Sequence, residues 1–330
     1  MDLLRKLQRW WMLAVLLAVC GCAHHAKVLP EKIRTVYAVE NKTDDPSTFL
    51  APLFLTYEHE NPYNRIGRPS AIGGEEGQKG IFVDTDKPAV YYMVRRFTTD
   101  RGEYTNYIYR VHFPKVPFSM IPFNLTAGKN VGLMIVLTVD SENRPLLITT
   151  VHTCGCYRAT LPTSYLPADA LPEDWEDGPL DVFGEKLPWS LDYAEMESPR
   201  LLVHLRPGVH RVMNLEVMEE KALNSNSGFH LIETPLLPMD ELESIPLNGD
   251  TTSFYHDKGW LKGHVKGSVK LLESIFLSLI SFDLFVGTDK AYGDPDVTGN
   301  PFYTSLKPWN RNASDMWDFA RFLQFWGWKL

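Results

Sequence analysis

The sequence predicts an α+β protein, in which an antiparallel β-rich sheet or sandwich carries a C-terminal layer of amphipathic helices. Runs of alternating residue types, separated by short turns, dominate the middle of the 330-residue chain. A helical period of apolar residues occurs only toward the C-terminal end. Hydrophobic residues make up 44% of the sequence, which is enough for the core of one large domain or two small ones.

The first element is a short export signal. It has a basic head, formed by Arg5, Lys6 and Arg9, and a run of apolar residues at positions 10–19. A transmembrane helix needs about 20 residues to cross roughly 30 Å of hydrocarbon, so this run is too short to span a bilayer. Residues 1–21 are therefore predicted to be a signal peptide that is removed.

The end of this signal resembles that of bacterial lipoproteins. Lipoprotein signals place a branched apolar residue three positions before the acylated cysteine and a small residue directly before it, and Val19, Gly21 and Cys22 match. The resemblance covers the N-terminus alone. It implies that Cys22 carries a diacylglycerol thioether and an N-acyl chain, and more than one chain is what stable anchoring requires. The alternative is cleavage after Ala23 with release of a soluble protein, because Gly21 and Ala23 also fit the small-x-small rule.

The resemblance also implies a location. An aspartate after the cysteine tends to retain such lipoproteins at the inner membrane, and this chain has Ala23 at that position. We therefore expect the protein in the cell envelope, anchored by lipid to the outer membrane and facing the periplasm. Its expected partners are the lipid bilayer, reached through acylated Cys22, and an envelope protein.

Charge argues against one class of partner. The signal holds three basic residues and one acidic residue, so the mature chain keeps 30 basic and 40 acidic residues, a net charge of −10. Bulk charge of this sign argues against binding nucleic acid or anionic lipid. No nucleic-acid partner is expected.

Residues 22–31 are predicted to be a tether and residues 32–260 a β-rich domain. In the first expected hairpin, residues 90–96 alternate in type and residues 100–102 supply a turn. Residues 161–189, rich in Pro, Asp, Glu and Trp, are expected to form a long surface excursion or lid. The predicted hairpins are 90–96 with 104–112, 131–139 with 146–156, and 201–205 with 209–217.

Residues 261–330 are predicted to be a helical segment that packs on the β-rich domain. Between residues 269 and 286, apolar residues recur on one side of a helix and polar residues on the other. Ser314 is predicted to cap the free amides of a final helix at residues 314–326. The apolar side of the first helix holds Leu271, Ile275, Leu279 and Phe282, and its polar side holds Lys270, Glu273, Ser274, Ser278 and Ser281.

The densest cluster of reactive side chains comprises His152, Cys154 and Cys156. Removal of the signal and lipidation leave no other free cysteine. Alternate residues of a strand share one face, so the three side chains are expected to project together in steps of about 6.6 to 6.8 Å. Three ligands that span about 13 Å can hold one ion only if the strand bends, and Gly155 is where bending is easiest.

Three interpretations of this cluster stay open. Cys154 and Cys156 could form a local disulfide in an oxidising periplasm. They could instead pack as free thiols at the end of a strand. With His152 they could ligate zinc, copper or haem, although the sequence has neither the Cys-x-x-Cys-His haem pattern nor paired Cys-x-x-Cys spacing. Apart from this last interpretation, no cofactor is expected.

No catalytic residue is predicted. The sequence has no Gly-x-Ser-x-Gly elbow, no phosphate-binding glycine-rich loop and no His-Glu-x-x-His helix. The predicted function is that of a membrane-tethered periplasmic lipoprotein in the binding, assembly or maintenance of the envelope. The alternative is a thiol-redox protein, or a metal- or haem-binding one, that uses residues 152–156.

Overall fold

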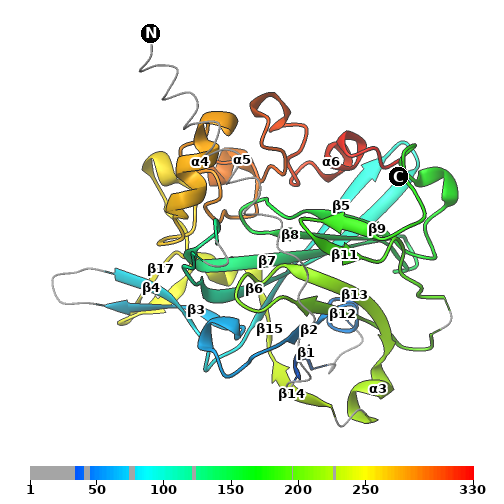
Figure 1. Cartoon of the computed structure of the whole chain (residues 1–330), viewed down its shortest axis with the longest axis horizontal. Coiled ribbons are helices and arrows are strands. Elements are labelled where there is room, and N and C mark those ends of the chain that lie inside the picture. The colour runs from blue at the N-terminus through cyan, green and yellow to red at the C-terminus, as the bar shows by residue number, and fades with distance from the viewer. Residues whose placement is uncertain (1–33, 41–44, 74–78, 121–123, 195, 226–227) are drawn as a thin grey trace.

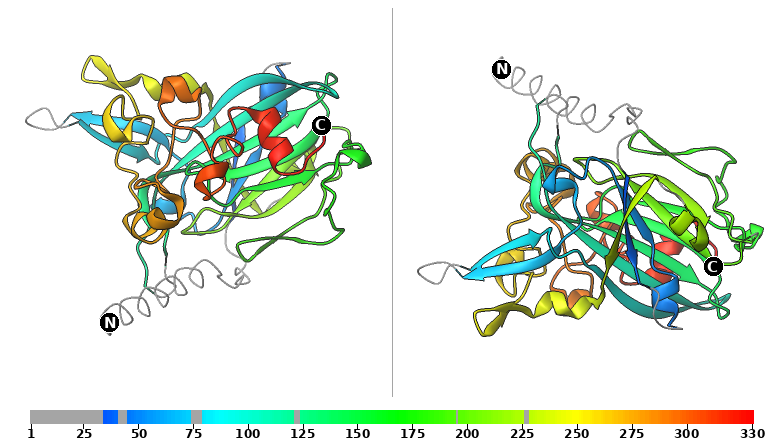
Figure 2. Two further views of the ribbon diagram at one scale, coloured as in Figure 1. Left: turned by 90° about the horizontal axis from the view of Figure 1, so that it is seen from above. Right: turned by 90° about the horizontal axis from the view of Figure 1, so that it is seen from below.

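The computed structural model describes residues 34–40, 45–73, 79–120, 124–194, 196–225 and 228–330. The predicted signal peptide, the tether at residues 22–31 and Cys22 lie outside these ranges. Within them the chain is mostly β-sheet with a few short helices (Figure 1 and Figure 2). The prediction of a β-rich α+β protein is confirmed at this level.

The largest sheet, here called the central sheet, has six strands in the order β15-β5-β6-β7-β8-β9. Neighbouring strands are antiparallel except β15 and β5, which are parallel. Two of the predicted hairpins, β5–β6 and β7–β8, lie side by side in it. The strands are β5 (Val90–Thr99), β6 (Gly102–Val116), β7 (Gly128–Val139), β8 (Pro145–His152), β9 (Ala159–Pro162) and β15 (Leu236–Pro238).

A second sheet has five strands in the order β13-β12-β2-β1-β14. The third predicted hairpin forms its β12–β13 pair, whereas β1 with β14 and β2 with β12 are parallel. Its strands are β1 (Arg34–Val39), β2 (Leu53–Thr56), β12 (Pro199–Leu205), β13 (Val212–Glu219) and β14 (Phe229–Thr234). Two-stranded sheets pair β3 (Arg68–Gly73) with β4 (Lys79–Asp84), β10 (Leu180–Val182) with β11 (Glu185–Leu187), and β16 (Ile245–Leu247) with β17 (Asp250–Thr252).

The central and second sheets enclose one apolar core. In β6, Tyr107, Tyr109 and Phe113 contribute to this core, which also holds Phe54 of β2 and Val203 of β12. Because successive side chains of a strand point to opposite faces, the intervening β6 residues lie on the other face of the central sheet. The structure thus has two sheets around a shared core, as in a sandwich.

The C-terminal part of the chain covers that other face. Ile108, Met134 and Val136 of the central sheet belong to a second core together with Phe254 and Phe322. Most of the covering chain is turns and irregular segments, and its described α-helices are α4 (Leu271–Ser281), α5 (Pro295–Thr298) and α6 (Phe319–Phe325). The remaining short helices are α2 (Pro46–Phe49), α3 (Glu220–Ser225) and the 3-10 turns Pro62–Asn64, Ala168–Ala170, Met239–Glu243, Gly259–Leu261 and Pro308–Asn310.

The last helix begins later than predicted. It starts at Phe319, and the carboxylate of Asp318 caps it by accepting a hydrogen bond from the backbone N–H of Arg321 at 3.3 Å. Ser314 does not cap a helix. It is buried, and its hydroxyl oxygen accepts a hydrogen bond from the backbone N–H of Ser305 at 3.1 Å. Ser314 therefore holds two irregular segments together.

The predicted excursion at residues 161–189 begins within β9 and contains the β10–β11 hairpin. Its middle is held against the C-terminal end of the chain, because the rings of Trp175 and Trp328 lie 5.1 Å apart. The excursion is therefore tied to the rest of the fold.

Helix α4 packs with part of its polar side against the rest of the fold. Lys270, which precedes it, and Glu273 are buried, although they belong to the polar side. Leu271, Ile275 and Leu279 of the apolar side are 56–64% exposed. Among the helices that the structure describes, none is long and apolar enough to cross a bilayer. Helix α4 thus covers buried charges and presents an apolar side outward.

Candidate functional site

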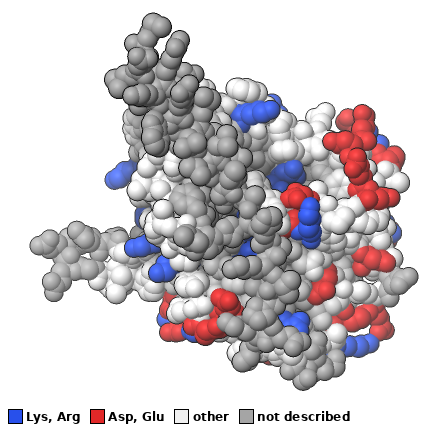
Figure 3. Space-filling view, viewed as in Figure 1, with Lys and Arg blue, Asp and Glu red and all other residues white. Residues whose placement is uncertain are grey.

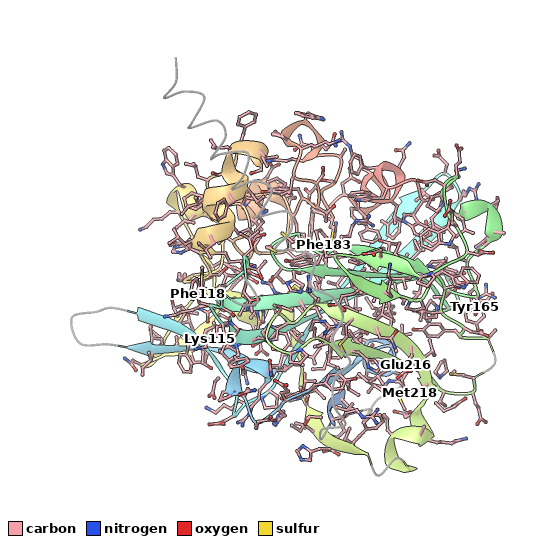
Figure 4. The ribbon with its side chains drawn as sticks, in the orientation of Figure 1. Lys115, Phe118, Tyr165, Phe183, Glu216 and Met218 are labelled. Carbon is pink, nitrogen blue, oxygen red and sulfur yellow. The ribbon has the colours of Figure 1, made fainter. Side chains whose placement is uncertain are left out.

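A pocket of 630 Å³ lies between α4, the turn that follows β8 and residues 303–306. Phe183, labelled in Figure 4, reaches it from the turn between β10 and β11. Both cysteines of the sequence cluster line it as well. Its volume is in the range of about 300 to 1,000 Å³ that small-molecule sites occupy. The apolar lining includes Leu125, Phe183, Phe276, Leu277, Val286 and Trp326.

A tight turn brings the cysteines to this pocket. Strand β8 ends at His152, whose backbone N–H donates to the carbonyl of Cys156 at 2.9 Å. Gly155 has a φ of +89°, and its N–H donates to the carbonyl of His152 at 2.7 Å. A Cβ at Gly155 would overlap the carbonyl oxygen of Tyr303, so both its backbone angle and its surroundings require glycine. The predicted strand therefore stops before Cys154.

His152 does not join the cysteines in a ligand set. Its Nε2 lies 3.2 Å from the backbone oxygen of His210, and its ring packs against the edge of Tyr157 at 5.0 Å. Burial holds the pKa of His152 well below its ordinary value, so the ring is neutral. Within the described ranges, no three His, Cys, Asp or Glu side chains are grouped to hold a metal ion. The prediction that His152, Cys154 and Cys156 share one face of a strand is wrong, because the strand ends at His152 and a tight turn follows.

A buried ion pair, formed by Lys270 and Asp289, lies next to the turn and contacts it at Thr153. The Nζ of Lys270 lies 3.1 Å from Oδ2 of Asp289, and both side chains are at most 1% exposed. Asp289 also accepts hydrogen bonds from the hydroxyl of Ser268 at 2.9 Å, from the N–H of Gly132 at 3.2 Å and from the hydroxyl of Thr153. Burial alone would lower the pKa of Lys270, but the carboxylate of Asp289 and the nearby thiols raise it well above its usual value. The ammonium is therefore charged.

The two thiols form an asymmetric pair. Cys154 and Cys156 are free and hydrogen-bond to each other, and the Sγ of Cys156 lies 3.4 Å from Oε1 of Glu273. Burial would raise the pKa of Cys154, but the bond from Cys156 and the charge of Lys270 bring it below its ordinary value. The same bond, together with burial, raises the pKa of Cys156 well above its ordinary value. The more acidic thiol is therefore the deeply buried one, since Cys154 is 2% exposed.

Arg158 is a cation in the pocket wall. Its guanidinium stacks over the ring of Trp326 at 3.7 Å and donates to the hydroxyl of Thr160 at 3.0 Å. No carboxylate within the described part of the chain forms an ion pair with it. The carboxylate of Asp181, which also lines the pocket, pairs instead with Lys186 at 2.6 Å. Burial lowers the pKa of Arg158 to about 10, so the guanidinium stays charged at neutral pH.

The sequence pattern indicated part of this site. Cys154 and Cys156, which line the pocket, were predicted as site residues, whereas Arg158 was not, and Lys270 and Glu273 were expected only on the polar side of a helix. Arg158 follows the second cysteine by two residues, and this adjacency is the one sequence signal that could have identified it. The buried position of the two helix charges has no comparable local signal.

The site combines an apolar wall, a cation and two thiols. The wall can bury an apolar body, the guanidinium can donate paired hydrogen bonds to an anionic group, and an ionised Cys154 can act as a nucleophile. No protein-family model, curated protein or solved structure matches this chain.

Proposed function

We propose that this protein is a membrane-tethered envelope lipoprotein that binds an amphiphile, a molecule with an apolar body and an anionic head group. The pocket beside α4 carries this proposal, because its lining is mainly apolar and Arg158 is charged and lacks a described carboxylate partner there. Burying an apolar ligand stabilises a complex by about 0.8 kcal/mol per methylene group. A hydrogen bond to a charged group adds about 1.5 to 3 kcal/mol.

The proposed location follows from the N-terminal sequence. Acylated Cys22 anchors the chain in the outer membrane, and the folded part faces the periplasm. The twelve residues from Cys22 to position 33 reach about 40 Å when fully extended, so the folded part of the chain stays close to a bilayer. A lipoprotein held there is well placed to bind membrane-derived amphiphiles and to act in envelope assembly or maintenance.

Two fluorescent probes that differ in one charge test the head-group part of this proposal. N-phenyl-1-naphthylamine is neutral, and 1-anilinonaphthalene-8-sulfonate carries a sulfonate on nearly the same skeleton. We expect both to bind the purified protein saturably. Arg158→Gln should weaken the sulfonate probe about tenfold, because a charged hydrogen bond is lost, and change the neutral probe less than about twofold. Fluorescence titration measures both affinities.

The exposed Arg101, which lies in the turn between β5 and β6, provides the control. Arg101→Gln should leave both affinities unchanged. If Arg158→Gln weakened the binding of both probes equally, Arg158 would shape the pocket and would not recognise the negative charge of the sulfonate. Absence of saturable binding by either probe would overturn the amphiphile proposal itself.

A second candidate function is thiol–disulfide exchange, which the adjacent free thiols of Cys154 and Cys156 favour. In that reaction the Cys154 thiolate attacks a protein disulfide, forms a mixed disulfide and releases one thiolate of the substrate. Cys156 then loses its proton and attacks Cys154, which closes a Cys154–Cys156 disulfide and releases the second substrate thiolate. This function ranks second, because the thiol with the lower pKa is the less accessible one.

A further inference from the structure

The outer side of α4 is an apolar surface without a described partner. Leu271, Ile275, Leu279 and Phe282 follow one another at helical spacing and are 56–77% exposed. Soluble proteins bury such a stripe against their own core, and here the polar side of the helix takes that place. The connection between β6 and β7 adds Phe118, which is 65% exposed. We call these residues the outer surface of α4.

Basic side chains border this surface. Lys115 and Lys129 are exposed and lie directly opposite each other in the β6–β7 ladder. Gly128, next to Lys129, approaches Lys270 at the start of α4 so closely that an added Cβ would overlap it. Figure 4 shows Phe118 below α4 and Lys115 farther below it. Two lysines at paired positions repel each other, so this arrangement favours an anionic partner.

Acidic side chains are scarce around the outer surface of α4. Residues 113–132 contain no Asp or Glu, and residues 258–282 contain one acidic residue, the buried Glu273, and four lysines, of which Lys270 is buried and paired with Asp289. The next carboxylate, Asp283, accepts a hydrogen bond from the hydroxyl of Tyr303. The acidic residues in view in Figure 3 lie mostly on the right and lower parts of that face. The local charge thus differs in sign from the net charge of the chain.

We infer that the outer surface of α4 lies on an anionic lipid bilayer, with Leu271, Ile275, Leu279 and Phe282 at the level of the headgroups. Apolar residues with lysines beside them are typical of helices that lie in the plane of the bilayer interface. A symmetric contact with a second copy would bring Lys115 and Lys129 of both copies together, and like charges oppose it. The inference rests on the proposed lipid anchor, which keeps the chain at the membrane.

The same helix then connects the bilayer with the pocket. Phe276 and Leu277 line the pocket, and Ile280 both lines it and is 46% exposed. Contact of the outer surface with the bilayer places this wall of the pocket at the membrane. The amphiphile enters from the lipid phase past Ile280.

Photo-crosslinking of the complete, lipid-bearing mature chain tests this contact. Leu279→p-benzoylphenylalanine places the reactive group on the outer surface of α4, and Val94→p-benzoylphenylalanine places it on β5, where the native valine is 45% exposed. Figure 1 shows β5 on the other side of the molecule from α4. Each variant is bound to vesicles of phosphatidylethanolamine and phosphatidylglycerol, irradiated and analysed by mass spectrometry.

We expect a phospholipid adduct at position 279 with a yield about tenfold above that at position 94. Vesicles of phosphatidylcholine should lower the yield at position 279 by about threefold or more, because the electrostatic attraction is removed. An adduct with a second copy or with another part of the same chain would overturn the inference, and so would a lipid yield equal to that at position 94. The intact mass reports acylation of Cys22 separately, and probe binding by the same samples reports the pocket.

Discussion

Replacement of the buried Lys270 by methionine is expected to lower the free energy of unfolding by about 3 to 5 kcal/mol. The Nζ of Lys270 lies 3.1 Å from Oδ2 of Asp289, and neither side chain reaches solvent appreciably. Lys270→Met preserves most of the side-chain volume but leaves the Asp289 carboxylate buried without its counter-ion. The loss in the free energy of unfolding therefore comes from the unpaired Asp289 carboxylate and not from a cavity.

Urea denaturation of the wild type and of Lys270→Met measures this loss. Lys258→Met removes an exposed lysine and should change the free energy of unfolding by less than about 0.5 kcal/mol. Adding Asp289→Asn to Lys270→Met should recover about 1 kcal/mol or more, because the uncompensated charge is gone. If Lys270→Met lowers the free energy of unfolding no more than Lys258→Met does, the ion pair of Lys270 and Asp289 does not stabilise the fold.

Acidification below pH 6.5 is expected to destabilise the fold by several kcal/mol. Burial lowers the pKa of His210 to about 4, from an ordinary value of 6.5. Between these values the unfolded chain binds a proton that the folded chain does not, so stability falls as the pH falls. At about 1.36 kcal/mol per pKa unit, His210 alone contributes about 3 kcal/mol at pH 7, and acidification to pH 4 removes most of it.

His112 acts in the same direction. Its Nε2 accepts a hydrogen bond from Nε of Arg110 at 3.1 Å, so it must be unprotonated. Burial and the charge of Arg110 hold its pKa well below the ordinary value. Urea denaturation at pH 7, 6, 5 and 4 measures the combined effect. His210→Phe, which keeps a ring beside Phe113, should flatten the curve, and a stability that does not change over this range would contradict the assignment of neutral histidines.

The three hairpins were predictable because their determinants are local. Alternating side chains at residues 90–96 and the turn at residues 100–102 specify β5 and β6 without information from elsewhere. The parallel pairs β1–β14 and β2–β12 join segments far apart in the sequence, and no local pattern reveals them. The sequence could therefore predict a sheet or sandwich but not the order of its strands.

The geometry of the site depends on contacts between distant residues. The turn at Gly155 follows from its close approach to Tyr303, so alternation alone wrongly extended the strand to Cys156. The helical period of residues 269–286 distinguished an apolar side from a polar side of α4. It did not show which side packs against the rest of the fold. That choice depends on Asp289, which lies outside the helix and pairs with Lys270. Both contacts, that of Gly155 with Tyr303 and that of Lys270 with Asp289, join residues distant in the sequence, so a local pattern cannot predict them.

The most direct test of the amphiphile pocket compares one substitution at two positions of α4. Leu277 lines the pocket, whereas Leu279 lies on the outer surface and does not. A tryptophan at position 277 fills part of the pocket, so Leu277→Trp should weaken binding of N-phenyl-1-naphthylamine about tenfold or more, and Leu279→Trp should change it less than about twofold. Equal affinities for the two variants in a fluorescence titration would contradict binding in this pocket.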